Sequence, residues 1–402
     1  MKMKCGRKQG DLKYVYRASF FWVMVMVLLQ STVVTAGRMK AVPGITLRQE
    51  YSDNIDYAVK EEKSDFRTIV IPELKLRDRT ERLDILLKGL LRGYYYRTYD
   101  QYDNYDQKYT GEVDYRMSER LIAGFQGKFQ IDTQADREID ETGLVFDTRK
   151  RYSSGGSTGI TYMLSEKTVL RLTGSYTDYR FDSDDYVNSW IANVNASFTT
   201  NLSRWVSNAI DRTNIAYSRY DYGDTKVDNY NITKGVSWRI SERSEAVIDL
   251  GGRYTRYTQQ IYSVEETSGY WGWVGQLTYN RNYETMSWEM NASRTMENAG
   301  GRTNASIRTA LNGVCHIRLA ETMSCRANIS YFLNETEYRY EGVEDGKETA
   351  WRGALAWVYG LTKDISAQVQ YAYSRTTDTF DNRINRHVVG IQVSYHLPLG
   401  DE

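Results

Sequence analysis

Alternation of side-chain type with a period of two residues is the feature of this sequence that most restricts its fold. Between residues 105 and 117, one set of alternate positions is mostly apolar or aromatic, and the other is mostly charged. The first set is Tyr105, Gln107, Tyr109, Gly111, Val113, Tyr115 and Met117, and the second is Asp106, Lys108, Thr110, Glu112, Asp114 and Arg116. Because successive side chains of a strand point to opposite faces, this pattern predicts a strand with one apolar and one hydrated face.

The same alternation recurs along the chain, for example in 121–133 and 349–361. Short turns rich in Ser, Glu, Lys, Asp and Asn separate these segments from longer polar loops, which include 52–65, 135–150, 220–228 and 260–268. The chain contains 34 Tyr but only 3 Pro, which also favours strands. Eight short turns and nine longer loops predict about eighteen strands, with sixteen as the alternative because the strand faces near 206–218 are ambiguous.

Long strands with a charged face opposite an apolar face predict an all-β fold, a transmembrane antiparallel up-and-down β-barrel. A sheet in hydrocarbon cannot leave backbone groups unpaired on an open edge, so the barrel must close. The last strand, near Arg386 to Leu397, is therefore expected to pair with the first, near Ile45 to Tyr51. An even number of strands places both termini on the short-turn side, which is periplasmic in bacterial barrels.

The first 36 residues have the organisation of a signal peptide, with a basic start, an apolar run from Ala18 to Leu29 and small residues ending at Ala36. An uncleaved membrane anchor is the alternative. We therefore expect 1–36 to be a signal peptide and 37–402 to form one barrel domain. Removing the six basic residues and Asp11 of this segment from 52 basic and 52 acidic residues leaves 46 and 51, which gives no basic domain for nucleic acid.

The predicted inner face carries more cations than anions. The candidate lumen-lining basic residues are Arg67, Lys75, Lys88, Arg92, Lys108, Arg116, Lys128, Arg171, Arg308, Arg326 and Arg352. A basic-lined pore favours anions, acidic polysaccharides among them, because a narrow wall of low dielectric strengthens the field. The alternative is that many of these residues only ring the periplasmic rim or pair with inward carboxylates.

No residue pattern indicates catalysis, a metal site or a cofactor. The histidines are His316, His387 and His396, and none has a metal-ligand spacing with another His or Cys. Cys315 and Cys325 flank a short turn, and they could form a disulfide in an oxidising periplasm or remain two small apolar residues on the outward face. We expect no enzymatic activity, no metal and no cofactor.

Both ends of the predicted barrel carry a resemblance. The segment from Gly44 to Ile55, GITLRQEYSDNI, and the segment from Asn385 to Tyr395, NRHVVGIQVSY, resemble the first and last strands of the outer-membrane barrels called β-barrel porin type 2. Members of that group often accompany exopolysaccharide-export or PEP-CTERM (exosortase) systems. The resemblance implies a Gram-negative outer-membrane barrel and assigns no catalytic residues.

The leading functional hypothesis is a monomeric pore, or part of a pore, for exopolysaccharide export. Its expected partners are outer-membrane lipid, an acidic polysaccharide and periplasmic export components. The first alternative is a general diffusion porin for small anionic solutes, with the 135–150 loop as the candidate constriction. A structural or scaffold barrel with a plugged lumen is the second alternative, and a sheath around a multihaem electron conduit is the third.

Overall fold

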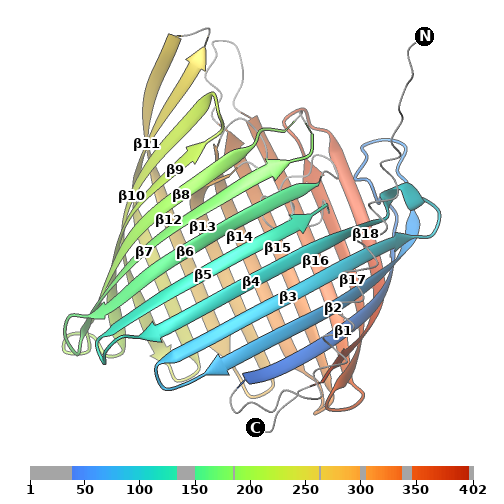
Figure 1. Ribbon diagram of the computed structural model, residues 1–402, viewed down its shortest axis with the longest axis horizontal. Helices are drawn as coiled ribbons and strands as arrows, with labels where there is room; N and C mark the ends of the chain where they lie inside the picture. The colour runs from blue at the N-terminus through green and yellow to red at the C-terminus, as the bar shows by residue number, and fades with distance from the viewer. Residues whose placement is uncertain are drawn as a thin grey trace, which may run out of the picture.

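A computed structural model describes residues 39–133, 150–183, 186–261, 264–298, 305–336 and 346–397. These residues form a closed barrel of eighteen antiparallel strands (Figure 1). The predicted fold class is therefore confirmed, and the alternative of sixteen strands is wrong. The proposed signal peptide, 1–36, lies outside the described residues.

The strands follow one another around the barrel in chain order. The first nine are β1 (Met39–Ser52), β2 (Asp65–Arg79), β3 (Leu83–Tyr96), β4 (Asn104–Arg116), β5 (Leu121–Asp132), β6 (Arg151–Met163), β7 (Thr168–Phe181), β8 (Ser189–Asn201) and β9 (Ala209–Asp221). The others are β10 (Thr225–Ser241), β11 (Ser244–Ile261), β12 (Val264–Asn282), β13 (Met286–Asn298), β14 (Ala305–Arg318), β15 (Met323–Thr336), β16 (Gly346–Gly360), β17 (Ile365–Thr377) and β18 (Arg383–His396). A short 3₁₀ helix, η2 (Asp100–Tyr102), lies between β3 and β4. In the described part of the chain, no helix has the length and apolar character needed to cross a membrane.

Closure occurs where the sequence predicts it. β1 pairs with β2 on one side and with β18 on the other, with Ile45 opposite Tyr395 and Tyr51 opposite Val389. The amide of Leu397 donates to the carbonyl of Pro43, so the described chain begins and ends at the rim that carries the short turns. The short-turn rim and the long-loop rim are thus the two ends of the barrel.

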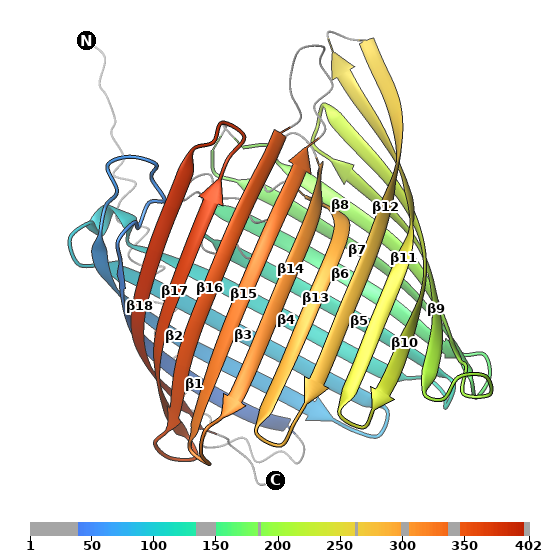
Figure 2. The ribbon, with the colours of Figure 1, turned by 180° about the vertical axis from the view of Figure 1, so that it is seen from behind.

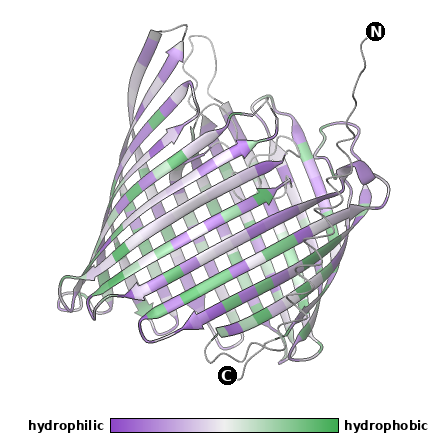
Figure 3. Ribbon diagram, in the orientation of Figure 1, coloured by the Kyte–Doolittle hydropathy of each residue, from purple (hydrophilic) through white to green (hydrophobic). Residues whose placement is uncertain are grey.

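The outward face carries exposed apolar and aromatic side chains on every strand, as a transmembrane barrel requires. The large apolar side chain of Ile391 is 60% exposed, and the amphipathic side chain of Trp271 is 81% exposed. Figure 3 shows hydrophobic and hydrophilic residues alternating along the strands. In water such a surface would be an aggregation site, whereas in lipid it is the favourable one.

Two predicted loops are largely strand. The segments 220–228 and 260–268 were expected to be loops because they are polar, but β9 and β10 are joined by residues 222–224, and β11 and β12 are paired up to Ile261 and Val264. β10, β11 and β12 are consequently long, with 17, 18 and 19 residues, and they rise above their neighbours in Figure 1. Above the membrane neither face needs to be apolar, so polarity is no guide to pairing there.

Candidate functional site

All eleven predicted basic residues lie on the inner face by strand parity. Eight of them line two large cavities inside the barrel. These are Arg67, Lys75, Lys88, Arg92, Lys108, Lys128, Arg326 and Arg352. Arg116 lies at the short-turn end of β4, Arg171 donates a hydrogen bond to Thr161, and the Arg308 guanidinium stacks on Phe332. Those three take part in neither cavity.

The first cavity, of about 790 Å³, is here called the arginine chamber. Its lining comes from β14–β18 and β1–β5, ten consecutive strands that meet at the barrel closure. The outermost of these strands, β5 and β14, are nine strands apart around the barrel, so the cavity spans the lumen. Its lining includes seven cationic side chains and three carboxylates: Arg48, Arg67, Arg92, Lys108, Arg326, Arg352 and Arg386, with Glu50, Asp106 and Asp132. Arg48 and Arg386 are not among the eleven candidate residues. The chamber thus presents an excess of positive charge to any solute in it.

Glu50 is the carboxylate that organises one wall of the arginine chamber. It is 3% exposed, and its two oxygens accept Arg48 Nη1 at 3.1 Å and Arg67 Nη2 at 2.7 Å. Gln370 Nε2 donates to the same carboxylate at 2.9 Å. The network therefore joins β1, β2 and β17 across the closure of the barrel, and it holds Arg48 and Arg67 in place.

The loop between β1 and β2, residues 53–64, folds inward over this wall. Ile55 packs with Ile69 and Tyr94 in a buried apolar cluster. Tyr57 is buried, has a φ of 55°, and lies with its ring 4.6 Å from the Arg386 guanidinium, to which its hydroxyl is also hydrogen-bonded. This loop narrows the long-loop end of the lumen. The predicted constriction, 135–150, falls almost entirely outside the described residues. The signal available for 53–64 was its group of apolar and aromatic side chains, Ile55, Tyr57, Ala58 and Val59, in an otherwise polar loop.

An ion pair joins the two arms of the same loop. Lys63 Nζ lies 2.9 Å from Asp56 Oδ2 and 3.2 Å from the Tyr102 hydroxyl. Two hydrogen bonds raise the pKa of Lys63 above its usual value. The hydrogen bond to Asp56 has the larger effect and the one to Tyr102 the smaller. Lys63 therefore stays charged throughout the physiological pH range, and the loop remains tied to the 3₁₀ helix that follows β3.

The second cavity, of about 840 Å³, is here called the lysine chamber. Lys75, Lys88, Lys108 and Lys128 line it together with Glu73 and Glu112, and hydroxyls of Ser153, Ser157, Ser175 and Thr177 form its other wall. Lys75 stands directly opposite Lys88 in the β2–β3 ladder, although like charges in that position are destabilising. Lys88 lies 3.8 Å from Glu112, which offsets this repulsion only in part. Lys108 lines both chambers, so the basic surface runs from one to the other.

The possible disulfide between Cys315 and Cys325 is not formed. Both cysteines are free, and they lie on the outward face of β14 and β15. Cys315 pairs with Ala327 and Cys325 pairs with Ile317, so the two cysteines are diagonal neighbours. Diagonal side chains are typically about 7–8 Å apart, which exceeds the reach of a disulfide. In the described part of the chain, no group of three His, Cys, Asp or Glu side chains is arranged to hold a metal ion.

No protein-family model and no curated protein matches the chain. Among solved structures, the chain is similar to Pseudomonas aeruginosa OccK2 (OpdF) in complex with glucuronate, with 12% identity and a TM-score of 0.47 over 91% of this chain and 100% of that one. It is similar to Acinetobacter baumannii OccAB4, with 8% identity and a TM-score of 0.47 over 90% and 99% of the two chains. The unliganded ferric citrate transporter FecA has 10% identity and a TM-score of 0.46 over 84% and 60%.

Proposed function

We propose that this protein is an outer-membrane channel for the diffusion of small anionic solutes. The observation that carries the proposal is the basic surface shared by the two chambers, in which Lys75 faces Lys88 directly and Lys108 connects one chamber to the other. A fold gains no stability from facing like charges. An anion in transit is stabilised by them, because a series of cationic side chains replaces the hydration that the anion loses.

The electrostatic reason is the difference between the lumen and bulk water. Charges on a narrow wall of low dielectric focus the field and raise the local concentration of counter-ions. Successive cations along the path let a solute leave one group as it meets the next, and such weak multiple binding is what conduction requires. We place the short-turn rim in the periplasm and the long loops outside, as in bacterial single-chain barrels.

The test is uptake of size-matched solutes into liposomes that contain the refolded protein without residues 1–36. We expect gluconate to enter faster than glucose, and glucose faster than glucosamine, because the three differ mainly in charge. Equal rates for the three solutes would contradict an anion channel. Entry of none of them into vesicles whose protein is folded would favour the scaffold with a plugged lumen.

Export of an acidic exopolysaccharide is the second candidate function. It is supported by the continuity of the basic surface through Lys108, since a polyanionic chain would contact both chambers at once. In the same vesicles, passage of a long acidic polysaccharide such as alginate would favour this function. Passage of gluconate with retention of alginate would favour the diffusion channel. The inward fold of the 53–64 loop makes the second result the expected one.

A further inference from the structure

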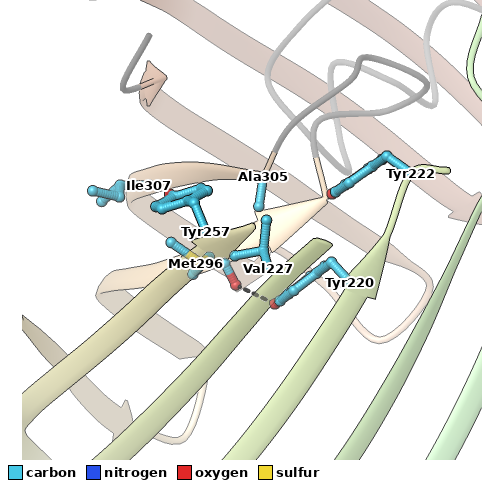
Figure 4. Packing of buried hydrophobic residues seen from close by; sticks show 7 residues of the cluster. All are labelled: Tyr220, Tyr222, Val227, Tyr257, Met296, Ala305 and Ile307. Carbon is cyan, nitrogen blue, oxygen red and sulfur yellow. Dashed lines mark hydrogen bonds between the residues drawn. The ribbon is translucent and has the colours of Figure 1, made fainter. Parts of the chain in front are cut away.

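The inward face of the extension that β10–β12 form above the other strands is covered by the chain itself. The Tyr220 hydroxyl of β9 donates to the Met296 carbonyl of β13 at 3.0 Å, and Tyr257 of β11 belongs to the same apolar cluster (Figure 4). The outward face carries the exposed side chains of Lys226 and Arg256. Figure 2 shows the extension rising above the neighbouring strands, so its outward face borders whatever surrounds the barrel.

A row of four aromatic rings crosses the outward face of β9–β12. The rings of Tyr217, Tyr230, Tyr254 and Trp271 follow one another with centroids 5.1, 6.4 and 5.0 Å apart. Ile232, the next outward residue of β10 toward the short-turn end, is exposed and apolar. Because Tyr and Trp concentrate at the membrane interface, this row marks the limit of the hydrocarbon on the long-loop side.

The height of Asp228, the next outward residue above Tyr230, agrees with this limit. Ten residues of β10 separate Asp228 from Trp238, which is exposed on the outward face near the short turns. They span about 34 Å along the strand, or about 26 Å of height at a tilt of about 40°. The apolar band of such barrels is about 25 Å tall and has aromatic residues at both edges. Asp228 therefore lies at the level of the lipid head groups.

At this level two guanidinium groups flank one buried carboxylate. Arg256 Nη2 lies 2.9 Å from Asp228 Oδ2, and Arg219 Nη1 lies 3.8 Å from Asp228 Oδ1. The Tyr217 hydroxyl donates to Asp228 Oδ1 at 2.6 Å. Asp228 is 3% exposed, whereas both arginine side chains are more than a third exposed. The carboxylate thus positions the two cations, and the cations are what a ligand meets.

Both arginines line a cavity of about 260 Å³ on the outward face, here called the outer cavity. Lys226 is a third cation in its lining, and Asp224 and Glu265 are carboxylates at its far end. Glu265 pairs with Gln260, four residues beyond Arg256 and so about 13 Å further along the strand. Pockets that enclose a drug-sized ligand measure about 300–1,000 Å³, so the outer cavity suits a head group and leaves the rest of a larger molecule outside.

We propose that the outer cavity binds a phosphate group of a lipid in the leaflet at the long-loop end. The planar guanidinium groups of Arg219 and Arg256 match pairs of phosphate oxygens, and their bonds to Asp228 leave further N–H donors for a ligand. The acyl chains of the lipid then lie against the aromatic row and the apolar strands below it, a contact that a free anion does not make. The outer cavity lies outside the lumen, so the proposal does not depend on the anion pathway.

The test is native mass spectrometry of the refolded protein without residues 1–36, equilibrated in a non-ionic detergent with lipid A, an acylated disaccharide that carries two phosphates. We expect the bisphosphorylated form to be retained best, the monophosphorylated form less well and the dephosphorylated form least, because the three share their acyl chains. Equal retention of the three would overturn the phosphate site. Displacement of lipid A by inorganic phosphate at constant ionic strength would assign the cavity to a free oxyanion and overturn the lipid.

Substitution of the two arginines places the binding in the outer cavity. Arg219→Gln with Arg256→Gln is expected to weaken the apparent affinity for lipid A at least about tenfold, or about 1.4 kcal/mol. The matched control is Arg180→Gln with Arg383→Gln, two exposed arginines at the long-loop ends of β7 and β18 that each pair with a nearby aspartate. The control should change the affinity by less than about twofold. Equal losses in the two double variants would overturn the site.

A third variant removes the buried charge together with its partners. Because the double substitution leaves the Asp228 carboxylate buried without a cation, it is also made with Asp228→Asn. The amide keeps the shape of the side chain and still accepts from the Tyr217 hydroxyl, so we expect this variant to fold, as its heat-dependent mobility in gel electrophoresis will show. Loss of lipid A from the folded variant supports the site, and retention of lipid A by it overturns the site.

Discussion

Replacing Lys75 and Lys88 with glutamate is expected to change the channel from anion-preferring to cation-preferring. The two residues face each other in the lysine chamber, and each substitution replaces a positive charge with a negative one on the path of the ion. Facing charges act at short range in a narrow lumen, so we expect the permeability ratio of chloride to potassium to fall at least about tenfold, or about 1.4 kcal/mol. The measurement is the reversal potential of single channels in a potassium chloride gradient.

The matched control changes the net charge by the same amount, but at two residues that lie away from the path of the ion. Lys167→Glu with Lys363→Glu alters two exposed residues in short turns, outside the β-strands. Screening over a Debye length of about 8–10 Å weakens their effect on the lumen. We expect their permeability ratio to stay within about twofold of the unmodified protein. Equal shifts in the two double variants would mean that net charge, and not the lysine chamber, sets selectivity.

Removing the Glu50 carboxylate is expected to cause the largest loss of stability. In Glu50→Ala, the buried Arg67 loses a partner at 2.7 Å, Arg48 loses one at 3.1 Å, and Gln370 loses an acceptor. Removal of one partner from a buried ion pair typically costs about 3–5 kcal/mol. The measurement is the free energy of unfolding in urea, followed by tryptophan fluorescence in lipid vesicles.

Glu112→Ala is the comparison for Glu50. The Glu112 carboxylate pairs with Lys88 at 3.8 Å, and both side chains are well hydrated, so the expected loss is below about 1 kcal/mol. Glu50→Gln should lie between the two, because it keeps the shape and one acceptor oxygen. If Glu50→Ala and Glu112→Ala lose the same stability, the Glu50 network does not hold the barrel closure together.

The alternation of side chains was sufficient to predict the barrel and its inner face. In β4 the period of two places Lys108 inward and Tyr109 outward. The structure has the same parity, with Lys108 lining a lumen cavity and Tyr109 stacked on the exposed Phe129. The parity works because the membrane imposes it on both faces at once: lipid selects apolar residues on one side, and water selects polar residues on the other. Tyr94 and Tyr96 occupy the same alternate positions of β3 as Arg92. They face inward, as the alternation predicts for these positions.

The sequence could not predict features that depend on contacts between distant strands. Glu50 becomes an acceptor for Arg67 and Gln370 only when β1 lies between β2 and β18. The hydrogen bond from Tyr220 to the Met296 carbonyl forms only because β13 leaves the β12 ladder after Arg294. The alternation of side chains in β13 continues unchanged past that point, so it gives no sign of the departure. The extension of β10–β12 has only scattered apolar residues, Val227 and Tyr257 among them, so its pairing leaves no clear period in the sequence.

The reversal potential of the unmodified, signal-free protein in a planar bilayer tests the central claim most directly. With a potassium chloride gradient across the membrane, we expect a potential of the sign that chloride selectivity requires, and its size should fall as ionic strength rises and screens the chamber lysines and arginines. A potential of the opposite sign, or the absence of conductance from a barrel that resists unfolding, would contradict an open, basic-lined pathway.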